Sequence, residues 1–511
     1  MTGRQAGHDR DKLRRDKLRL HSVSVTPGLA PIAGGGLAVL LLAGSAKSET
    51  LVEAMTRAYR SNPSFHAERY KLRATDEEVA RALSGWRPRV AANGFYGWRN
   101  QRHEADPSRT GSSDTYGYGL AIEQPLFDGF QTKHAVSQAE SNVAAGRAEL
   151  SAFENELLFQ VAAVYLDVLR EEGIVLFRRK SLAALKREVI GVTEQLARGQ
   201  ATATDLDQAR LRASRAQSDL DQSTANLRVS ELRYTRLTGR TPADLVMPVF
   251  PQARLPQTLD DAAARAEREN PIIEAATLKH AAATHAVSRT RGELLPIASI
   301  VGSYDRSVND SSTTLDRDGF SVVGRLRVPL YQRGEVSARV RQTHNIALQV
   351  EREGLDARSR IGEAVRAAWA TLLSARARTK ADEDAVEAGE KALEGIRTEQ
   401  RHGRRSVIAV LDADRELVEA RIRLLRTTRD LFVSAYALIR STGRLTVAEL
   451  APGSSTYDPE THYRQVRNMW WGTSTPSTGD DALLGNGEKP TAKAAQRAGR
   501  WNTTINRAGA R

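Results

Sequence analysis

The sequence has no cysteine, few aromatic residues and no long apolar run after its first 46 residues. The lack of cysteine excludes disulfides, thiolate metal sites, thiol catalysis and a lipidated N-terminal cysteine. Aromatic residues make up 5% of the chain and charged residues 27%, a composition that suits long solvated helices better than a thick globular core. No later segment has the about 20 consecutive apolar residues that a membrane-spanning helix needs.

Catalytic and metal-binding motifs are also missing. The closest histidine pair, His280 and His285, is five residues apart on a predicted helix, so the two rings diverge around it. No glycine-rich phosphate loop follows a predicted strand, and no Ser-His-Asp set can be argued from the sequence. We therefore predict a protein that is not an enzyme and that carries no cofactor or metal.

The net charge of +13 does not indicate a nucleic-acid partner. Residues 1–46 carry a net +4 and residues 452–511 a net +3, which leaves +6 for the long segment between them. Acidic and arginine residues are interleaved along that segment, whereas a nucleic-acid-binding protein concentrates positive charge on one face. We predict no nucleic-acid binding.

The first 46 residues have the composition of an export signal. A leader with six basic residues between positions 10 and 19 precedes an apolar core at 37–43, and small residues at 43–46 suit cleavage. The alternative is a disordered basic tail followed by a buried helix. A signal peptide would direct the protein out of the cytoplasm.

The rest of the chain contains the same pattern twice. Asn62-Pro63 recurs 208 residues later as Asn270-Pro271, and the Thr-Gly-Arg at 238–240 recurs 204 residues later at 442–444. Spacing conserved over about 200 residues indicates a duplicated unit. We predict a first repeat over 47–248, a proline-rich connector over 249–260, a second repeat over 261–451, and a largely disordered tail over 452–511.

Each repeat is predicted to contain a helix, a β-hairpin and two long helices. Tyr116, Tyr118, Leu120 and Ile122 alternate with small or polar residues, which is typical of a strand with one apolar face. We place the hairpins at 89–125 and 296–329, and the helices at 131–198, 201–238, 334–402 and 405–443. Apolar residues recur every seven positions along these helices, which predicts coiled-coil packing: Val136, Val143, Leu150, Leu157 and Val164; Leu206, Ala213, Leu220, Leu227 and Tyr234; Val410, Leu417, Leu424, Leu431 and Leu438.

Four strands of about ten residues have the length that crosses an outer-membrane hydrocarbon layer at a tilt. Four strands cannot close a barrel, and open sheet edges are not tolerated in lipid. Several copies of the chain would therefore have to combine their strands in a symmetric ring. The helices alone would favour an ordinary coiled-coil scaffold.

The chain resembles the TolC family of trimeric outer-membrane channels over roughly residues 49–451. The matching features are the two Asn-Pro starts, the segment 124–129 (QPLFDG), its counterpart 328–334 (VPLYQRG), and the two glycine-containing helical tips. The resemblance implies a mainly α fold with a membrane β-barrel. Each homotrimer would have a twelve-stranded barrel in the outer membrane and a helical tunnel through the periplasm of a Gram-negative bacterium.

The family's function is that of an exit duct for a tripartite efflux pump or a type I secretion system. The implied partners are a periplasmic adaptor protein, an inner-membrane pump of the ABC or RND type, and outer-membrane lipid. The alternative is a periplasmic adaptor or coiled-coil scaffold without a pore, although an adaptor would usually have one helical hairpin rather than two equal halves.

A water-filled barrel needs its polar face inward. By the strand alternation, Glu123, Arg325 and Arg327 would face the barrel lumen. The alternative is that these side chains lie near the barrel mouth and are simply solvated.

The two helical tips are the predicted gate and adaptor-docking surface. The docking residues are Arg198, Gly199, Gln200, Gly403 and Arg404. In the resembled family, polar links between the tip helices hold the periplasmic entrance closed. Carried over by position, Thr204 and Asp205 would face Arg405. Gln400 stands where the family has a gate tyrosine, and Asp412 matches one of two family aspartates while Ala409 replaces the other. The alternative is that these are solvated turn charges.

Overall fold

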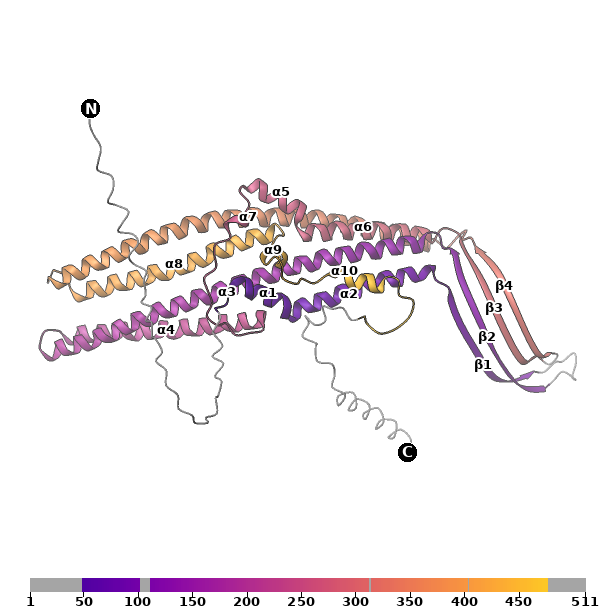
Figure 1. The fold of residues 1–511 in the computed structure, drawn as a ribbon, viewed down its shortest axis with the longest axis horizontal. Coiled ribbons are helices and arrows are strands. Elements are labelled where there is room, and N and C mark those ends of the chain that lie inside the picture. Colours follow the sequence, from indigo (N-terminus) through magenta and orange to yellow (C-terminus); the bar gives the residue numbers. More distant parts are fainter. Residues whose placement is uncertain (1–47, 102–110, 312–313, 403, 477–511) are drawn as a thin grey trace, which may run out of the picture. The chain divides into compact units, whose positions relative to one another are not determined.

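The structure, a computed structural model, describes residues 48–101, 111–311, 314–402 and 404–476. The predicted signal peptide lies outside these residues. Helices account for most of the described chain, and four strands form one curled sheet at one end of the helices (Figure 1). The predicted fold class is confirmed. In the part that the structure describes, no helix is both long and apolar enough to cross a bilayer.

Two helices of 67 residues each form the centre of the two repeats, α3 (Gln131–Ala197) and α7 (Glu335–Arg401). At 1.5 Å per residue, each is about 100 Å long. Helix α4 (Ala203–Thr238) returns along the C-terminal half of α3, and α8 (Val407–Ser441) returns along α7 (Figure 1). The residues of the three predicted heptad series are buried or half-buried, so the seven-residue pattern marks the packed seams of these hairpins.

The duplicated Asn-Pro pairs begin α2 (Pro63–Leu83) and α6 (Pro271–Gly292), which pack on the other halves of the long helices. The Asn62 carboxamide oxygen accepts from the Ser64 N–H (3.0 Å), and its Nδ2 donates to the carbonyl of Leu237 at the end of α4 (3.0 Å). Asn270 caps α6 in the same way and donates to Ser441 at the end of α8 (2.8 Å). Each motif therefore starts one helix and fixes it to the end of another.

The sheet has the order β1 (Arg89–Gln101), β2 (Gly111–Phe127), β3 (Ile297–Ser311) and β4 (Thr314–Arg327), all antiparallel. The two hairpins, about 200 residues apart in sequence, are joined by the β2–β3 pairing. Strands β1 and β4 are the edges, and neither pairs on its outer side with another strand of the described chain.

The β2–α3 junction requires glycine. Gly129 has φ +69°, and a Cβ there would lie 2.3 Å from the carbonyl oxygen of Gly292 at the end of α6. Only glycine combines the left-handed conformation with this close approach. The junctions of the two repeats are therefore held against each other where the helices meet the sheet.

A 3-10 turn at Ser84–Trp86 ends α2 next to the sheet. Shorter helices form a second layer around the middle of the long helices: α1 (Leu51–Ser61), α5 (Leu259–Glu269), α9 (Val447–Leu450) and α10 (Pro459–Val466), with a 3-10 turn at Gln252–Arg254. The largest core cluster lies at this level, where Met55, Tyr165, Tyr234 and Leu438 are fully buried. The hydroxyl oxygen of Tyr165 lies 2.7 Å from the carbonyl oxygen of Glu49 and 2.6 Å from that of Val246, which fixes the segment after α4 against the start of α1.

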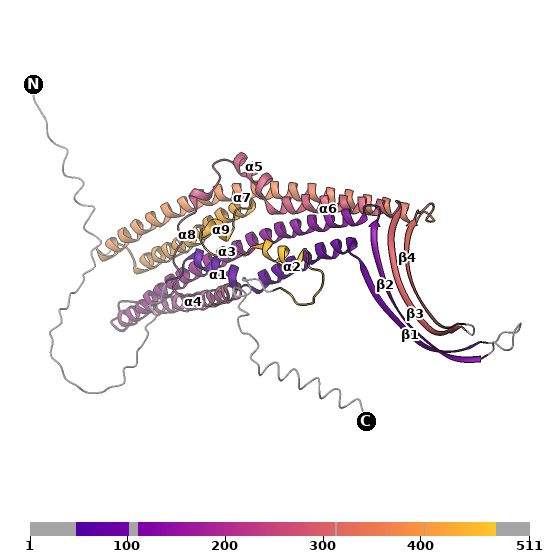
Figure 2. The same cartoon turned by 45° about the vertical axis from the view of Figure 1, so that its right-hand side comes forward.

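The prediction of a largely disordered tail over 452–511 is wrong for residues 452–476. Residues 457–471, here called the C-terminal strap, lie along α2 and α3 and include α10 (Figures 1 and 2). Tyr457, His462 and Val466 are buried. The composition of the segment is polar, but these three side chains cover groups that only the folded α2 and α3 bring together. Residues 477–511 lie outside the described chain.

Candidate channel lining and gate

The sheet has one apolar and one polar face, as the strand alternation predicts. Residues directly opposite in an antiparallel register share a face, and the pairings Ile122–Gly302–Val322 and Leu120–Tyr304–Phe320 run across three strands. The side chains of Leu120, Ile122, Phe320 and Val322 are all at least half exposed. This face is an apolar surface that covers several strands, and no other described segment packs against it.

Aromatic side chains form a band on the apolar face. Tyr96 is opposite Tyr116, and Tyr304 is opposite Phe320. Tyr118 and Tyr304 lie with ring centroids 6.5 Å apart. Such a band is typical of the interface between membrane and water.

The three predicted lumen residues lie on the polar face. Glu123 is opposite Arg89, Arg325 is opposite Ser299, and Arg327 is opposite Ile297. All three are near the ends of strands that join the helices, because β1 begins at Arg89 and β4 ends at Arg327. Mixed charge is therefore concentrated at the helix-proximal end of this face.

The α3–α4 tip is a tight turn. Gly199 has φ +73°, and the N–H of Gln200 donates to the carbonyl of Gln195 (2.8 Å). Arg198 and Gln200 are exposed on either side of the glycine. At the other tip the N–H of Arg404 donates to the carbonyl of Glu399 (2.9 Å), and Gly403 lies outside the described residues.

Within the described part of one chain, Asp205 and Arg405 each have a partner on their own hairpin. Asp205 accepts from both the N–H and the hydroxyl of Thr202 (2.9 and 2.7 Å), which makes a capping box at the start of α4. These hydrogen bonds hold the pKa of Asp205 below its ordinary value. Arg405 forms an ion pair with Glu399 on its own hairpin (2.8 Å).

The remaining predicted gate residues lie at different places around the tips. Thr204 is exposed on the first turn of α4. Gln400 lines a cavity of about 700 Å³ beside Arg397 and Arg401 at the end of α7. Of the predicted gate residues, Asp412 forms an ion pair that joins the two hairpins within the described chain: its carboxylate lies 3.3 Å from the Arg212 guanidinium of α4.

The Arg212–Asp412 pair lies in a groove between the two tip hairpins. The groove has a volume of about 880 Å³ and is lined by both hairpins. Farther from the tips, Arg178 of α3 binds Glu419 of α8 (2.7 Å) and Asp219 of α4 (3.2 Å). Arg212 and Arg178 could not be identified from the sequence, because neither has a local motif and their partners are distant in sequence.

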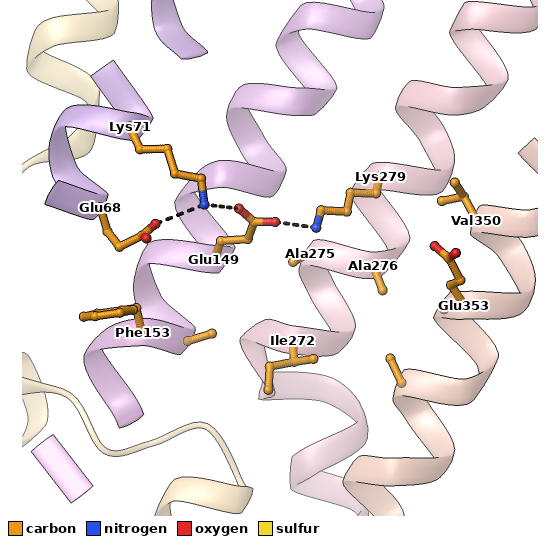
Figure 3. A pocket seen from close by; sticks show the side chains of 13 residues that line it. Glu68, Lys71, Glu149, Phe153, Ile272, Ala275, Ala276, Lys279, Val350 and Glu353 are labelled. Carbon is orange, nitrogen blue, oxygen red and sulfur yellow. Dashed lines mark hydrogen bonds and ion pairs between the residues drawn. The ribbon is translucent and has the colours of Figure 1, made fainter. Parts of the chain in front are cut away.

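A second charged array lies on the α2–α3–α6–α7 layer (Figure 3). The Glu149 carboxylate binds the ammonium groups of Lys71 (3.5 Å) and Lys279, and Lys71 also binds Glu68 (3.1 Å). Burial raises the pKa of Glu149, but the two lysines lower it more, so the pKa lies below its ordinary value. These residues surround a cavity of about 470 Å³.

This array faces away from the C-terminal strap. Lys71 is two residues from both Arg69 and Arg73, and two residues correspond to about 200° around a helix. Arg69 and Arg73 are buried against Tyr457 of the strap. The layer therefore has a strap face and an opposite charged face, and only the second is left open along α2 and α3.

Comparison with known proteins identifies the family. The outer membrane efflux protein family matches residues 54–240 and 262–444, which is most of the chain in two parts. The chain belongs to this family of outer-membrane channels. The outer membrane efflux protein BepC of Brucella suis is 33% identical over 86% of this chain and 96% of its own length. The alkaline protease secretion protein AprF of Pseudomonas aeruginosa is 26% identical over 79% and 86%.

Solved structures agree with this assignment at the level of the fold. The CmeC outer membrane channel of Campylobacter jejuni superposes with a TM-score of 0.70 at 13% identity, over 86% of this chain and 98% of its own. The MtrE outer membrane channel of Neisseria gonorrhoeae gives 0.63 at 17% identity. The TolC-family resemblance, the outer-membrane location and the channel function are confirmed, and the scaffold alternative is not supported.

The outer membrane efflux proteins are transport channels rather than enzymes. In the described ranges no group of three potential ligand side chains is placed to hold a metal ion.

Proposed function

We propose that three copies of this chain form the exit duct of a tripartite efflux or type I secretion system. The observation that carries the proposal is the sheet: four strands, two unpaired edges and one apolar face. Lipid does not satisfy open backbone groups, so β4 of one copy would pair with β1 of the next until the barrel closes. Three copies supply twelve strands.

In this assembly the polar sheet face lines the pore, with Glu123, Arg325 and Arg327 at its helix-proximal end. The charged face of the helical layer continues the same lining, so that the Lys71–Glu149–Lys279 array borders the tunnel. The second layer with the strap then lies outside, because on the inner side it would fill the conduit. A lining of mixed charge suits passage of solutes through water.

The Arg212–Asp412 pair is the proposed latch at the periplasmic end. It connects α4 to α8, and so holds the two tip hairpins of one copy together. Asp412 is more than half exposed, so each pair contributes about 1 kcal/mol or less. Three weak pairs can be opened by a docking partner that binds the separated hairpins more tightly. Asp205 and Arg405 retain a proposed role only between neighbouring copies.

The proposed partners follow from the relatives. BepC is an efflux protein and AprF a secretion protein, so we propose a periplasmic adaptor at the exposed tips (Arg198–Gln200 and Arg404) and an inner-membrane ABC or RND pump. Both tips are short turns outside the packed seams, and the Cβ position of Gly199 is open. A partner's helical hairpin could approach these turns closely.

Conductance in planar phospholipid bilayers tests the duct and the latch. Wild-type protein should form channels of low conductance, and Arg212→Ala or Asp412→Ala should increase the conductance several-fold because the hairpins separate. Arg210→Ala is the matched control, since Arg210 is two residues away and forms an ion pair with Asp207 on its own helix. If neither the wild type nor the variants form channels, the duct is contradicted. If Arg212→Ala forms channels with the conductance of the wild type, the latch is contradicted.

A further inference from the structure

The C-terminal strap ends in two exposed tryptophans. Trp470 is 64% exposed and Trp471 88% exposed. Exposing two such large apolar side chains to water is unfavourable, since the transfer of each into an apolar medium would lower the free energy. The preceding strap residues are firmly docked, so the position of the tryptophans is determined by packing.

Several contacts hold the strap in place along α2 and α3. Tyr457 donates its N–H to the Tyr59 hydroxyl (3.1 Å), His462 binds Asp76 (2.9 Å), and Arg467 binds Glu140 of α3 (3.0 Å). Tyr59 is on α1 and Asp76 is on the following helix α2, whose C-terminal end leads to the sheet. The strap therefore runs from the middle of the molecule to the point where the helices meet the strands (Figures 1 and 2).

Arg87 fixes the end of the strap at this junction. Its Nη1 donates to the carbonyl of Met469 (2.6 Å), and its guanidinium lies 5.0 Å from the Trp470 ring centroid. Arg87 is two residues before the first residue of β1, and its neighbour Trp86 is itself 46% exposed. Three exposed tryptophan side chains thus come from segments at one level, next to the helix-proximal edge of the sheet.

This level is the edge of the apolar sheet face. Leu126 at the end of β2 and Leu330 and Tyr331 after β4 are also exposed there. Tryptophan and tyrosine prefer the boundary between hydrocarbon and headgroups, because the ring is apolar and the polar atom can bind water or headgroups. An arginine beside them supplies a partner for phosphate.

We infer that Trp470 and Trp471, with Arg87 and Trp86, form a membrane anchor that inserts into the headgroup region of the phospholipid leaflet facing the periplasm. The inference rests on the barrel proposed above, whose apolar face defines the membrane level. The strap lies on the face of α2 opposite Lys71, which is the outer face of the proposed tunnel. Lipid is favoured over a second protein because the patch continues the lipid-facing surface of the sheet. The anchor ties the C-terminal segment to the membrane in addition to the barrel itself.

The lack of cysteine makes a direct test possible. Trp471→Cys in the full-length chain gives a single site for a nitroxide spin label, read in nanodiscs of phosphatidylethanolamine and phosphatidylglycerol by collisions with oxygen and with a water-soluble nickel chelate. Leu120→Cys on the apolar sheet face is the lipid control. Arg464→Cys, on an exposed position of α10, is the water control. Heat-modifiable trimers on gels show that each variant has assembled.

The expected result is nickel accessibility at position 471 several-fold lower than at 464, with oxygen accessibility close to that at 120. Nickel accessibility equal to that at 464 overturns the anchor, and protection from both reagents also overturns it, because it indicates a protein covering. A Leu120 label in water instead refutes the barrel. If Trp471→Cys does not assemble, brominated phospholipids should quench wild-type fluorescence more than that of Trp470→Phe/Trp471→Phe, and equal quenching overturns the anchor.

Discussion

Replacing His462 by alanine should detach the C-terminal strap without unfolding the long helices. His462 is 2% exposed, and its Nδ1 lies 2.9 Å from the carboxylate of Asp76, which is fully buried. Burial raises the pKa of Asp76, and the contact with His462 opposes this increase. The histidine is therefore the partner that makes a buried carboxylate acceptable in this position.

The expected magnitude follows from the burial of both groups. Removing the partner of a buried carboxylate costs about 3–5 kcal/mol, because the carboxylate is left uncompensated. The positive charge of Arg147, which also lowers the pKa of Asp76, compensates part of this loss, so the lower end of the range applies. At about 1.4 kcal/mol per tenfold change, the undocked population should rise roughly 100-fold.

Hydrogen–deuterium exchange in nanodiscs measures this population locally. The N–H groups of Arg467 and Met469, which donate to the carbonyls of Tyr463 and Val466, should exchange about 100-fold faster in His462→Ala. Amides in the middle of α3 should be unchanged.

Two control variants make the test specific. Arg464→Ala removes only exposed ion pairs from the same helix. The free energy of strap opening, read from the exchange rates, should therefore change by less than about 1 kcal/mol. Asp76→Asn keeps a side chain that can hydrogen bond to His462, so the strap should open less than in His462→Ala. Strap exchange as slow in His462→Ala as in wild type would refute the argument that this pair holds the strap.

Two further predictions concern the sheet and the helical core. Leu120→Arg on the apolar face should cost about 2–4 kcal/mol in the bilayer and reduce the yield of heat-modifiable trimers, whereas Ala121→Arg on the polar face should assemble; equal yields would reverse the assignment of faces. Burial raises the pKa of Glu154 to about 7, although the hydrogen bond that its carboxylate accepts from the Val447 N–H (2.7 Å) lowers this pKa. Because this pKa is above the unfolded value of about 4.3, the folded state binds more protons, and stability should fall as pH rises from about 4 to 7. Glu154→Gln should flatten this dependence in melting curves at pH 5 and pH 8, and an unchanged slope would exclude Glu154 as its cause.

Much of the architecture could be predicted from local patterns. The period of seven marks the packed seams because a helix repeats its facing side every two turns. Strand alternation separates Tyr118 and Leu120 from Glu123 because side chains point to opposite faces of a sheet. The repeated Asn-Pro pairs mark the starts of α2 and α6, because the asparagine caps the helix and proline suits its first turn. Because four strands are too few to close a barrel, the sequence also predicts that more than one copy of the chain is needed.

The gate and the strap could not be predicted in this way. Arg212 meets Asp412 only after two hairpins have packed together, and the two residues are 200 positions apart with no spacing that links them. Asp205 takes part in the capping box of its own helix, and its predicted role in a latch with Arg405 stays a prediction.

The sequence by itself determined the repeats, the helix and strand positions, the two faces of the sheet and the family, because each depends on periodicity or on short motifs. Only the tertiary structure decided which charges meet across hairpins, and that the polar segment after residue 452 docks. Arg69, Arg73 and Asp76 lie along one side of α2. They are buried because Tyr457 and His462 of the strap cover them. Such complementarity belongs to surfaces formed from distant segments, and no local pattern encodes it.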